Sequence, residues 1–307
     1  MKPLLSTKGF TQRHLFNKKI FMYLFDNTIN KRLSGAGFTL VELLIVIAIL
    51  GILSVAVLGA INVTSSLNKA NLAKAKTFSA SVENTLSINQ VGKWSFEESS
   101  SPFKDTSGYG NNGLCSGVSC PVSQTASTCG LGFGGCLKFN GLDTFVTVAH
   151  HSSLNPTNAV TLVAWVKRMG NGGPPDANRG ILLSKSSNYL DARTTDFCMS
   201  LIINGDHKYK CAGVVSNGKW YHVVGTYDGT TFKIYIDGKE VFREGYLGTI
   251  TTLNDSLFIG SYNGVVGNGY FFNGFLDEPA IYNQAFTLSQ IQQLYAQGLP
   301  RHQLARQ

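Results

Sequence analysis

Three residues at the start of a long apolar segment have the types and the spacing for chemistry. The segment runs from residue 38 to residue 61, Gly37 precedes its first residue Phe38, and one carboxylate, Glu42, lies near its start. A carboxylate costs roughly 2.5–3.5 kcal/mol at the centre of a membrane helix and less near its end. A carboxylate kept at such a position is a candidate functional residue. The sequence therefore marks Glu42, together with Gly37 and Phe38, for closer attention.

The apolar segment is long enough to cross a membrane. As a helix it would rise about 36 Å, against a hydrocarbon core of about 30 Å. Residues 1–37 contain seven Lys and Arg and one acid, so they carry +6 of the formal net charge of +8. The positive-inside tendency places this leader in the cytoplasm and the rest of the chain outside it. The basic charge is thus a topogenic signal, and it gives no reason to expect nucleic-acid binding.

The stretch GFTLVELLIVIAILGILS at 37–54 resembles the N-terminus of type IV pilins and related pseudopilins. The resemblance implies that a prepilin peptidase cuts after Gly37 and that the new first residue, Phe38, is N-methylated. It also implies that Glu42 meets the positive N-terminus of a neighbouring pilin subunit during filament assembly. A glutamate that only reaches the lipid headgroups is the simpler alternative.

These residues divide the N-terminal part of the chain into three segments. Residues 1–37 are the expected prepilin leader, and 38–61 are a transmembrane assembly helix. Residues 62–90 contain no Pro or Gly and have apolar residues at helical spacing, so 62–92 are expected to be an amphipathic continuation and a linker. The expected location is the inner membrane before assembly, with the C-terminal domain outside the cytoplasm, and then a cell-surface or periplasmic filament.

From residue 93 the sequence changes to short alternating runs separated by turn residues, which is typical of an all-β domain. The clearest runs are TFVTVAH, VTLVAWVKR, GILLSKS, FCMSLIIN, KWYHVVGTYDG, TFKIYIDGKEV, SLFIGSY and GFLDEPAIY. Near the C-terminus Thr287 and Gln290 form a capping box, which predicts a short helix that ends at Gly298 and Pro300.

Over residues 93–299 these runs, with DTSGYGNNG and FNGFLDEPAIYNQAF, resemble the laminin-G-like, concanavalin-A-like jelly roll of secreted bacterial proteins. The resemblance implies two antiparallel sheets packed face to face. The predicted fold is mainly β: an antiparallel β-sandwich jelly roll carried on a long N-terminal α-helix whose first half is transmembrane. Residues 300–307 are the expected C-terminal tail.

Six cysteines lie between residues 115 and 211, and their even number favours disulfides in an oxidising compartment. Cys198 and Cys211 lie in adjacent strand-like runs, and we expect them to pair. The other four allow three connectivities, between which the spacing does not decide: Cys115, Cys120, Cys129 and Cys136.

The jelly-roll resemblance also implies a structural calcium ion (Ca2+) at Asp105, Asn111 and Asp277, because oxygen ligands suit a hard cation. The alternative is that Asp105 and Asn111 shape a turn and Asp277 accepts backbone hydrogen bonds. Two loops could line a ligand surface, although each is first of all a loop. They are 263–269 and 170–180, the second with Asn171, Asp176, Asn178 and Arg179. The expected environment of Trp94, Trp165 and Trp220 is the core.

We expect no catalytic residues. Jelly-roll glucanases resembling this domain carry two carboxylates in an E-x-D-x-x-E motif, which does not occur here. Asp277 and Glu278 are adjacent, so we expect them to point to opposite faces of a strand, where they cannot act as that pair.

Three functions stay open. The first is a pilin-like subunit of a type IV pilus or related filament whose adhesive domain binds an extracellular glycan or surface protein. The others are a type II secretion pseudopilin with a structural head and a membrane-tethered carbohydrate-active enzyme. The expected partners are prepilin peptidase, other pilin subunits and the inner membrane.

Cleavage after Gly37 yields the first prediction, a mature chain that begins with N-methylated Phe38. Mass spectrometry of the N-terminal peptide, purified from membranes or filaments, measures this directly. An intact leader, or a start after Ala60, would contradict it.

Overall fold

The computed structural model describes residues 40–41, 43–47, 84, 86–129 and 134–302. Contacts divide the chain into two units, 1–75 and 76–307, and each is described by itself. In the first unit the described residues between 40 and 47 are helical. Gly37, Phe38, Glu42 and most of the expected membrane segment lie outside the described residues. Within the described part of the chain, no helix combines the length and the apolar character that crossing a membrane requires.

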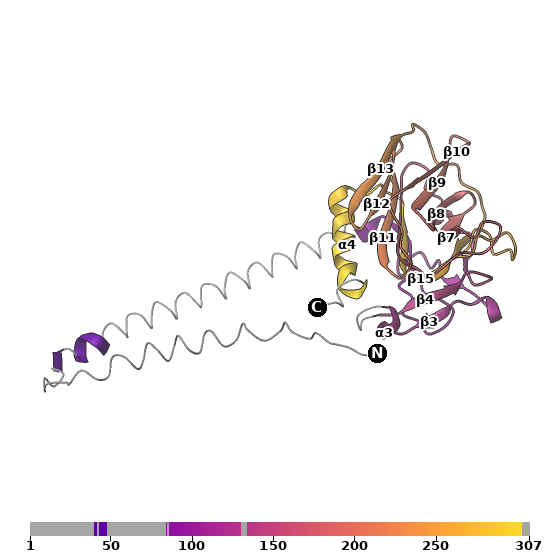
Figure 1. The fold of residues 1–307 in the computed structure, drawn as a ribbon. Helices are drawn as coiled ribbons and strands as arrows, with labels where there is room; N and C mark the ends of the chain where they lie inside the picture. The colour runs from indigo at the N-terminus through magenta and orange to yellow at the C-terminus, as the bar shows by residue number, and fades with distance from the viewer. Residues whose placement is uncertain (1–39, 42, 48–83, 85, 130–133, 303–307) are drawn as a thin grey trace, which may run out of the picture. The chain divides into compact units, whose positions relative to one another are not determined.

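The second unit is an antiparallel sandwich of two sheets (Figure 1). The eight-stranded sheet has the order β13 (Lys239–Gly245), β12 (Thr231–Ile236), β11 (Trp220–Tyr227), β6 (Val160–Arg168), β15 (Asn273–Tyr282), β4 (Cys136–Asn140) and β3 (Val122–Gln124), and β1 (Gln90–Lys93) also pairs with β15. The seven-stranded sheet has the order β10 (Asp206–Ala212), β9 (Phe197–Ile203), β8 (Asn188–Arg193), β7 (Arg179–Lys185), β14 (Leu257–Ile259), β5 (Val146–Val148) and β2 (Gly113–Leu114).

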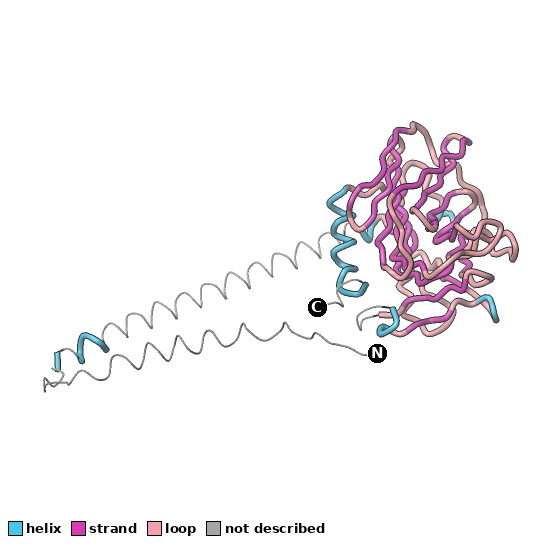
Figure 2. Tube along the Cα trace, viewed as in Figure 1, coloured by secondary structure: helices cyan, strands magenta, loops and turns pink. Residues whose placement is uncertain are grey.

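In the described part of this unit helices are fewer than strands, and loops join the strands (Figure 2). The helices are α3 (Ala126–Cys129), α4 (Leu288–His302) and the 3-10 turns η1 (Gly117–Ser119) and η2 (Ser152–Leu154), and residues 84 and 86–88 are also helical. The mainly β sandwich that the sequence predicts is therefore present.

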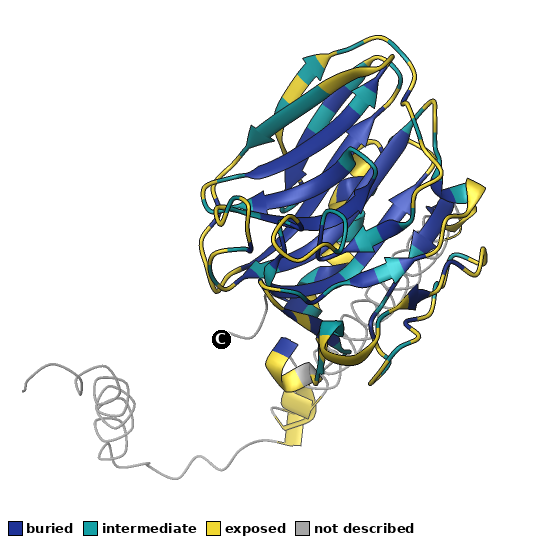
Figure 3. Cartoon of the chain, turned by 90° about the vertical axis from the view of Figure 1, so that its right-hand side faces the viewer, coloured by how far each residue is buried: buried dark blue, intermediate teal, exposed yellow. Residues whose placement is uncertain are grey.

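Period-two alternation places the core between the sheets. On β6, Leu162, Ala164 and Val166 belong to the main core cluster, whereas Val163 and Trp165 belong to separate clusters on the other side of the strand. Strand β11 is buried along its whole length for the same reason. Burial is therefore concentrated along the inner strands, and exposure is concentrated in loops and edges (Figure 3).

Tight turns follow the residue types that accept positive φ. Asp237 and Gly238, between β12 and β13, have φ values of 50° and 74°. Asn204 and Gly205, between β9 and β10, have φ values of 52° and 88°. Two successive positive φ values match the right-handed twist of a two-residue hairpin.

Helix α4 covers part of the outer side of the eight-stranded sheet. The predicted capping box is present, because the Thr287 N–H donates to Gln290 Oε1 at 2.8 Å and the Gln290 N–H donates to Thr287 Oγ1 at 3.4 Å. The predicted end of the helix is wrong: α4 continues past Gly298 and Pro300 to His302. Contacts at its last turn, described below, hold the residues that the sequence assigns to a tail.

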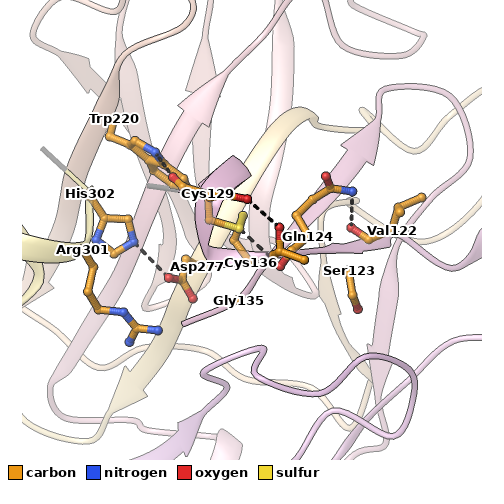
Figure 4. Close-up of a disulfide and its surroundings, with 12 residues drawn as sticks. Val122, Ser123, Gln124, Cys129, Gly135, Cys136, Trp220, Asp277, Arg301 and His302 are labelled. Atoms are coloured by element: carbon orange, nitrogen blue, oxygen red, sulfur yellow. Dashed lines mark hydrogen bonds and ion pairs between the residues drawn. A yellow bond between two sulfur atoms is a disulfide. The ribbon is translucent and has the colours of Figure 1, made fainter. Parts of the chain in front are cut away.

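The six cysteines form three disulfides, and the Cys198–Cys211 pair expected from the sequence is one of them. Its two residues lie directly opposite each other on β9 and β10. The connectivity that the sequence left open is Cys115–Cys120 and Cys129–Cys136. Around the latter, the Trp220 indole N–H donates to the Cys129 carbonyl at 2.6 Å (Figure 4).

Docking of α4 is predicted to depend on Ile291, whose side chain is 0% exposed. Ile291→Ala should lower the free energy of unfolding by about 2–5 kcal/mol, because it leaves a cavity against the sheet. Denaturant titration of the full-length chain in detergent, followed by tryptophan fluorescence, measures the change. Leu288→Ala is the matched control on the same helix, since Leu288 is 45% exposed and its loss should cost less than about 0.5 kcal/mol. Equal effects of the two substitutions would contradict the docking described.

Candidate functional site

The outward face of the seven-stranded sheet carries a row of polar and aromatic side chains. On β8, Leu190 and Ala192 enter the core, so the alternating residues Tyr189 and Asp191 lie on the opposite face. The strand register places Tyr189 opposite Ser200 of β9, and Ser200 opposite Tyr209 of β10. Three strands thus bring side chains from distant parts of the chain onto one surface.

Asp191 is at the centre of this face and is fully buried. Its Oδ2 accepts hydrogen bonds from Arg179 Nε at 3.0 Å and from the Tyr209 hydroxyl at 3.2 Å, and it forms an ion pair with Arg179 Nη2 at 2.9 Å. Burial raises the pKa of Asp191 to about 6, although the guanidinium of Arg179 opposes the shift. Burial also raises the pKa of Tyr209, and the Asp191 charge acts in the same direction. The hydroxyl of Tyr209 therefore remains a hydrogen-bond donor.

Aromatic rings surround the Arg179 guanidinium. Its Cζ lies 4.5 Å from the ring centroid of Tyr270, 5.2 Å from that of Tyr209 and 5.3 Å from that of Tyr189. Such cation–π contacts stabilise a partly desolvated guanidinium and keep it in a fixed plane. We call the whole group the tyrosine–arginine surface; it comprises Arg179, Tyr189, Asp191, Arg193, His207, Tyr209, Tyr262 and Tyr270.

The members of the tyrosine–arginine surface differ in exposure. His207 is exposed, whereas Tyr209, Tyr262 and Tyr270 are partly exposed and Tyr189 is buried beneath them. The ring of His207 stacks on that of Tyr209 with a centroid distance of 6.2 Å and an interplanar angle of 14°. Solvent therefore reaches several rings whose undersides are already packed.

The 170–180 loop meets Tyr270, the residue that follows the 263–269 loop, beside this surface. The Tyr270 N–H donates to the Pro174 carbonyl at 3.1 Å, and the Ile181 N–H donates to the Tyr270 carbonyl at 3.0 Å. Arg193 forms an ion pair with Asp176 at 3.5 Å. The backbone of both loops is therefore joined to the strands that carry the site.

Arg168 supports the longer loop from inside. Its side chain is 1% exposed, and it donates to the carbonyls of Ala192 at 2.7 Å and Ala177 at 3.4 Å. Burial lowers the pKa of Arg168, while the charges of Asp191 and Asp176 oppose that shift. A buried cation thus links β8 to the loop that carries Arg179.

The sequence anticipated part of this site. Of the four residues singled out in the 170–180 loop, Asp176 and Arg179 reach the tyrosine–arginine surface through their side chains. Asn171 and Asn178 instead offer their carbonyls to the Asn273 amide at 2.9 Å and the Thr194 N–H at 2.9 Å.

Strand β8 was missed, and with it Tyr189, Asp191 and Arg193. The alternation of these residues with Leu190 and Ala192 is a period-two signal that could have revealed the strand. The convergence of β8 with Tyr209 and Tyr270 has no comparable signal, because it depends on strand order.

The expected calcium ligands do not converge as free oxygens. Both Asp105 oxygens accept hydrogen bonds within one turn, including those from the Ser107 N–H at 2.9 Å and the Asn111 N–H at 2.9 Å. Asp277 instead contacts His302 Nε2 of α4 at 2.9 Å (Figure 4). This arrangement does not fit a cation site made by these three side chains alone, and calcium binding stays a prediction. Among the described residues a metal-like cluster occurs at Asp196, Cys198 and Cys211, but its two sulfurs form a disulfide.

The adjacent carboxylates Asp277 and Glu278 do not point to opposite faces, which corrects the expectation for a regular strand. The register of β15 with β6 shifts between Asp277 and Ala280, and Glu278 has φ 48°. This bulge turns both side chains toward α4, where Asp277 contacts His302 and Glu278 forms an ion pair with Arg301 at 2.5 Å.

The three tryptophans lie in the interior as expected, with exposures of 0%, 1% and 6% for Trp94, Trp165 and Trp220.

Known family models match both the N-terminal segment and the β domain. The prokaryotic N-terminal methylation motif matches residues 34–58, and the concanavalin A-like lectin/glucanases superfamily matches residues 140–292. No curated protein matches the sequence.

Among solved structures, the binding domain of Paraclostridial Mosquitocidal Protein 1 is similar, with a TM-score of 0.53 and 17% identity over 68% of this chain and 52% of that one. The receptor binding domain of the botulinum neurotoxin C/D mosaic serotype is also similar, with a TM-score of 0.53 and 16% identity over 69% of this chain and 52% of that one. This chain spans about half the length of these structures, and the likeness shows the fold.

The chain therefore joins a type IV prepilin N-terminal methylation segment to a laminin-G-like, concanavalin-A-like domain. The motif implies processing by a prepilin peptidase, insertion into a membrane and assembly with pilin subunits.

Proposed function

We propose that the chain is a type IV pilin-like filament subunit that displays its jelly roll as an adhesive head, and that the head binds an extracellular glycan without cleaving it. The methylation motif supports the filament role, because it marks the segment through which pilins are processed and assembled. The tyrosine–arginine surface supports the binding role.

The observation that carries the binding proposal is the combination of exposed rings and oriented polar groups. Saccharides offer C–H faces, which pack on aromatic rings, and hydroxyl groups, which need donors and acceptors in fixed directions. His207 supplies an exposed ring, Tyr209 and Tyr262 supply partly exposed rings, and Arg193 supplies guanidinium donors beside them. The packing beneath these side chains orders them before a ligand arrives, which reduces the entropy lost on binding.

The charges of the site favour a neutral ligand over a highly charged one. Arg179 is paired with Asp191, and Arg193 lies 3.5 Å from Asp176 and 4.0 Å from Asp196. Each guanidinium therefore has a carboxylate partner already. A neutral saccharide can exchange hydrogen bonds with these groups without breaking the ion pairs.

Binding without cleavage is supported by the engagement of the carboxylates. Glycoside hydrolysis needs two carboxyl groups placed about the scissile bond. Asp191 is covered, and Asp277 and Glu278 each contact a basic residue of α4. A carboxylate held in this way is not placed to protonate a leaving group.

A glycan array probed with the full-length chain in detergent tests the binding proposal. Tyr209→Ala and Tyr262→Ala should each weaken binding to the recognised glycan roughly tenfold, the effect of about 1.4 kcal/mol. Tyr109→Ala is the matched control, because Tyr109 is 48% exposed and lies outside the surface. Thermal melting of each variant checks folding, and oligosaccharide hydrolysis is assayed in parallel.

Each outcome of that experiment discriminates between functions. Binding by the wild type to no glycan would favour a secretion pseudopilin with a structural head. Reproducible cleavage would place the protein among carbohydrate-active enzymes. Binding that the two surface variants retain in full would move the site elsewhere on the head.

The filament role predicts the behaviour of Glu42→Ala. This variant should still insert into the membrane, because the substitution makes the segment more apolar, but its incorporation into filaments should fall at least tenfold. Immunoblots of membrane and sheared filament fractions measure both quantities. Glu42→Asp is the control that keeps a carboxylate, and normal incorporation of Glu42→Ala would show that Glu42 only reaches the headgroups.

A further inference from the structure

A cavity of about 370 Å3 lies between α4 and the outer side of the eight-stranded sheet. The helix contributes Leu294, Gln297 and Arg301, whose spacing places them on one helical face. The sheet contributes two rows of side chains, and the strand register shows which residues lie side by side in each row. Lys93, Ala280 and Val163 pair across β1, β15 and β6, and Trp165 pairs with His222 across β6 and β11.

The cavity continues into a second hollow of about 240 Å3. The two hollows share Lys93, Tyr282, Leu294 and Gln297, so Lys93 lies on the wall of both. The combined space is within the range of small-molecule sites rather than that of a packing defect.

Two buried nitrogen atoms on the cavity wall lack partners among the described residues. His222 is 1% exposed, and its Nδ1 makes no hydrogen bond. The Nε atom of Arg301 is also buried and also makes no hydrogen bond. A buried polar atom without a partner destabilises the empty cavity, and a ligand that bonds to it recovers that loss. Burial lowers the pKa of His222 to about 3, with a smaller contribution from the charge of His302, so its imidazole is neutral at neutral pH.

Of the two cations on the wall, Arg301 is in ion pairs and Lys93 is in none among the described residues. Arg301 forms ion pairs with both Glu278 and Glu97. In the part of the chain that the structure describes, no carboxylate lies within ion-pair distance of Lys93. Around these polar groups, Val163, Ala280 and Leu294 present hydrocarbon.

We propose that this cavity binds a small amphipathic carboxylate, with its carboxylate on Lys93 and its apolar part against Val163, Ala280 and Leu294. The cationic ammonium of Lys93 selects the anion, and the hydrocarbon walls select a ligand with an apolar body. The site is separate from the tyrosine–arginine surface, because the two lie on different sheets of the sandwich. It does not depend on the glycan proposal.

Isothermal titration calorimetry of the full-length chain in detergent tests this site with benzoate and with its neutral amide, benzamide. The heat of protein-free micelles is subtracted. Benzoate should bind saturably at one site, and benzamide should bind at least tenfold more weakly. Lys93→Met should weaken benzoate binding at least tenfold and leave benzamide binding unchanged. Lys104→Met, which removes an exposed lysine elsewhere, should behave as the wild type.

Two further variants keep the result interpretable. Lys93→Arg retains the positive charge and should bind benzoate within a few-fold of the wild type, even if Lys93→Met melts at a lower temperature. Tyr209→Ala should bind benzoate normally, because it alters only the tyrosine–arginine surface. Equal affinity for benzoate and benzamide, full binding by a folded Lys93→Met variant, or no saturable benzoate binding by the wild type would each overturn the proposal.

Discussion

The architecture of the β-sandwich follows from one constraint. The central strands of its eight-stranded sheet are apolar on both faces. Strands β6, β11 and β15 place one set of side chains in the sandwich core and another set on the outer side. Apolar surface on both sides favours cover on both sides, at about 25 cal/mol for each Å2 removed from water. The second sheet covers one side, and α4 covers part of the other. Helix α4 is therefore part of the sandwich rather than an appendage to it.

The way α4 docks explains several polar features beneath it. Trp165 is stacked against His302 with ring centroids 4.2 Å apart, and His302 contacts Asp277 from the same helix turn. The bulge in β15 directs both Asp277 and Glu278 to that turn. A ring stack, the His302–Asp277 hydrogen-bond contact and the ion pairs of Arg301 thus hold the last turn in helical form although it contains Pro300, which has no N–H to donate. The helix meets the sheet at separated points, and the space between them is the cavity that Lys93 lines.

The seven-stranded sheet differs from the eight-stranded one in the character of its outward face. Its outward rows are polar and aromatic, so no second layer is needed there, and they remain available as a surface. Two charges are buried beneath or beside that surface, and hydrogen bonds offset part of their desolvation: Asp191 Oδ2 accepts from Arg179 and Tyr209, and Arg168 of β6 donates to two carbonyls. Removing one partner of such a group is strongly destabilising, because the other is left buried and unpaired. The same contacts that orient the surface therefore stabilise the fold.

Many elements of this protein can be predicted from the sequence because local patterns determine them. The apolar run with Glu42, the period-two runs of β6 and β11, the Asp-Gly turn at 237 and 238 and the capping box at Thr287 all depend on neighbours within a few residues. Strand β8 could also have been predicted, since Tyr189, Asp191 and Arg193 alternate with core residues.

Tertiary structure decided what the local patterns left open. The assembly of Arg179, Asp191, Tyr209 and Tyr270 depends on strand order, and the bulge at Glu278 and the continuation of α4 to His302 depend on how the helix docks. The pairings Cys115–Cys120 and Cys129–Cys136 join near neighbours in the sequence, but the spacing alone did not choose between the three connectivities. Alternation specifies which face of a strand a residue occupies, but it does not specify the strand beside it, because many pairings satisfy the same pattern. That choice is made by the packing of the whole core.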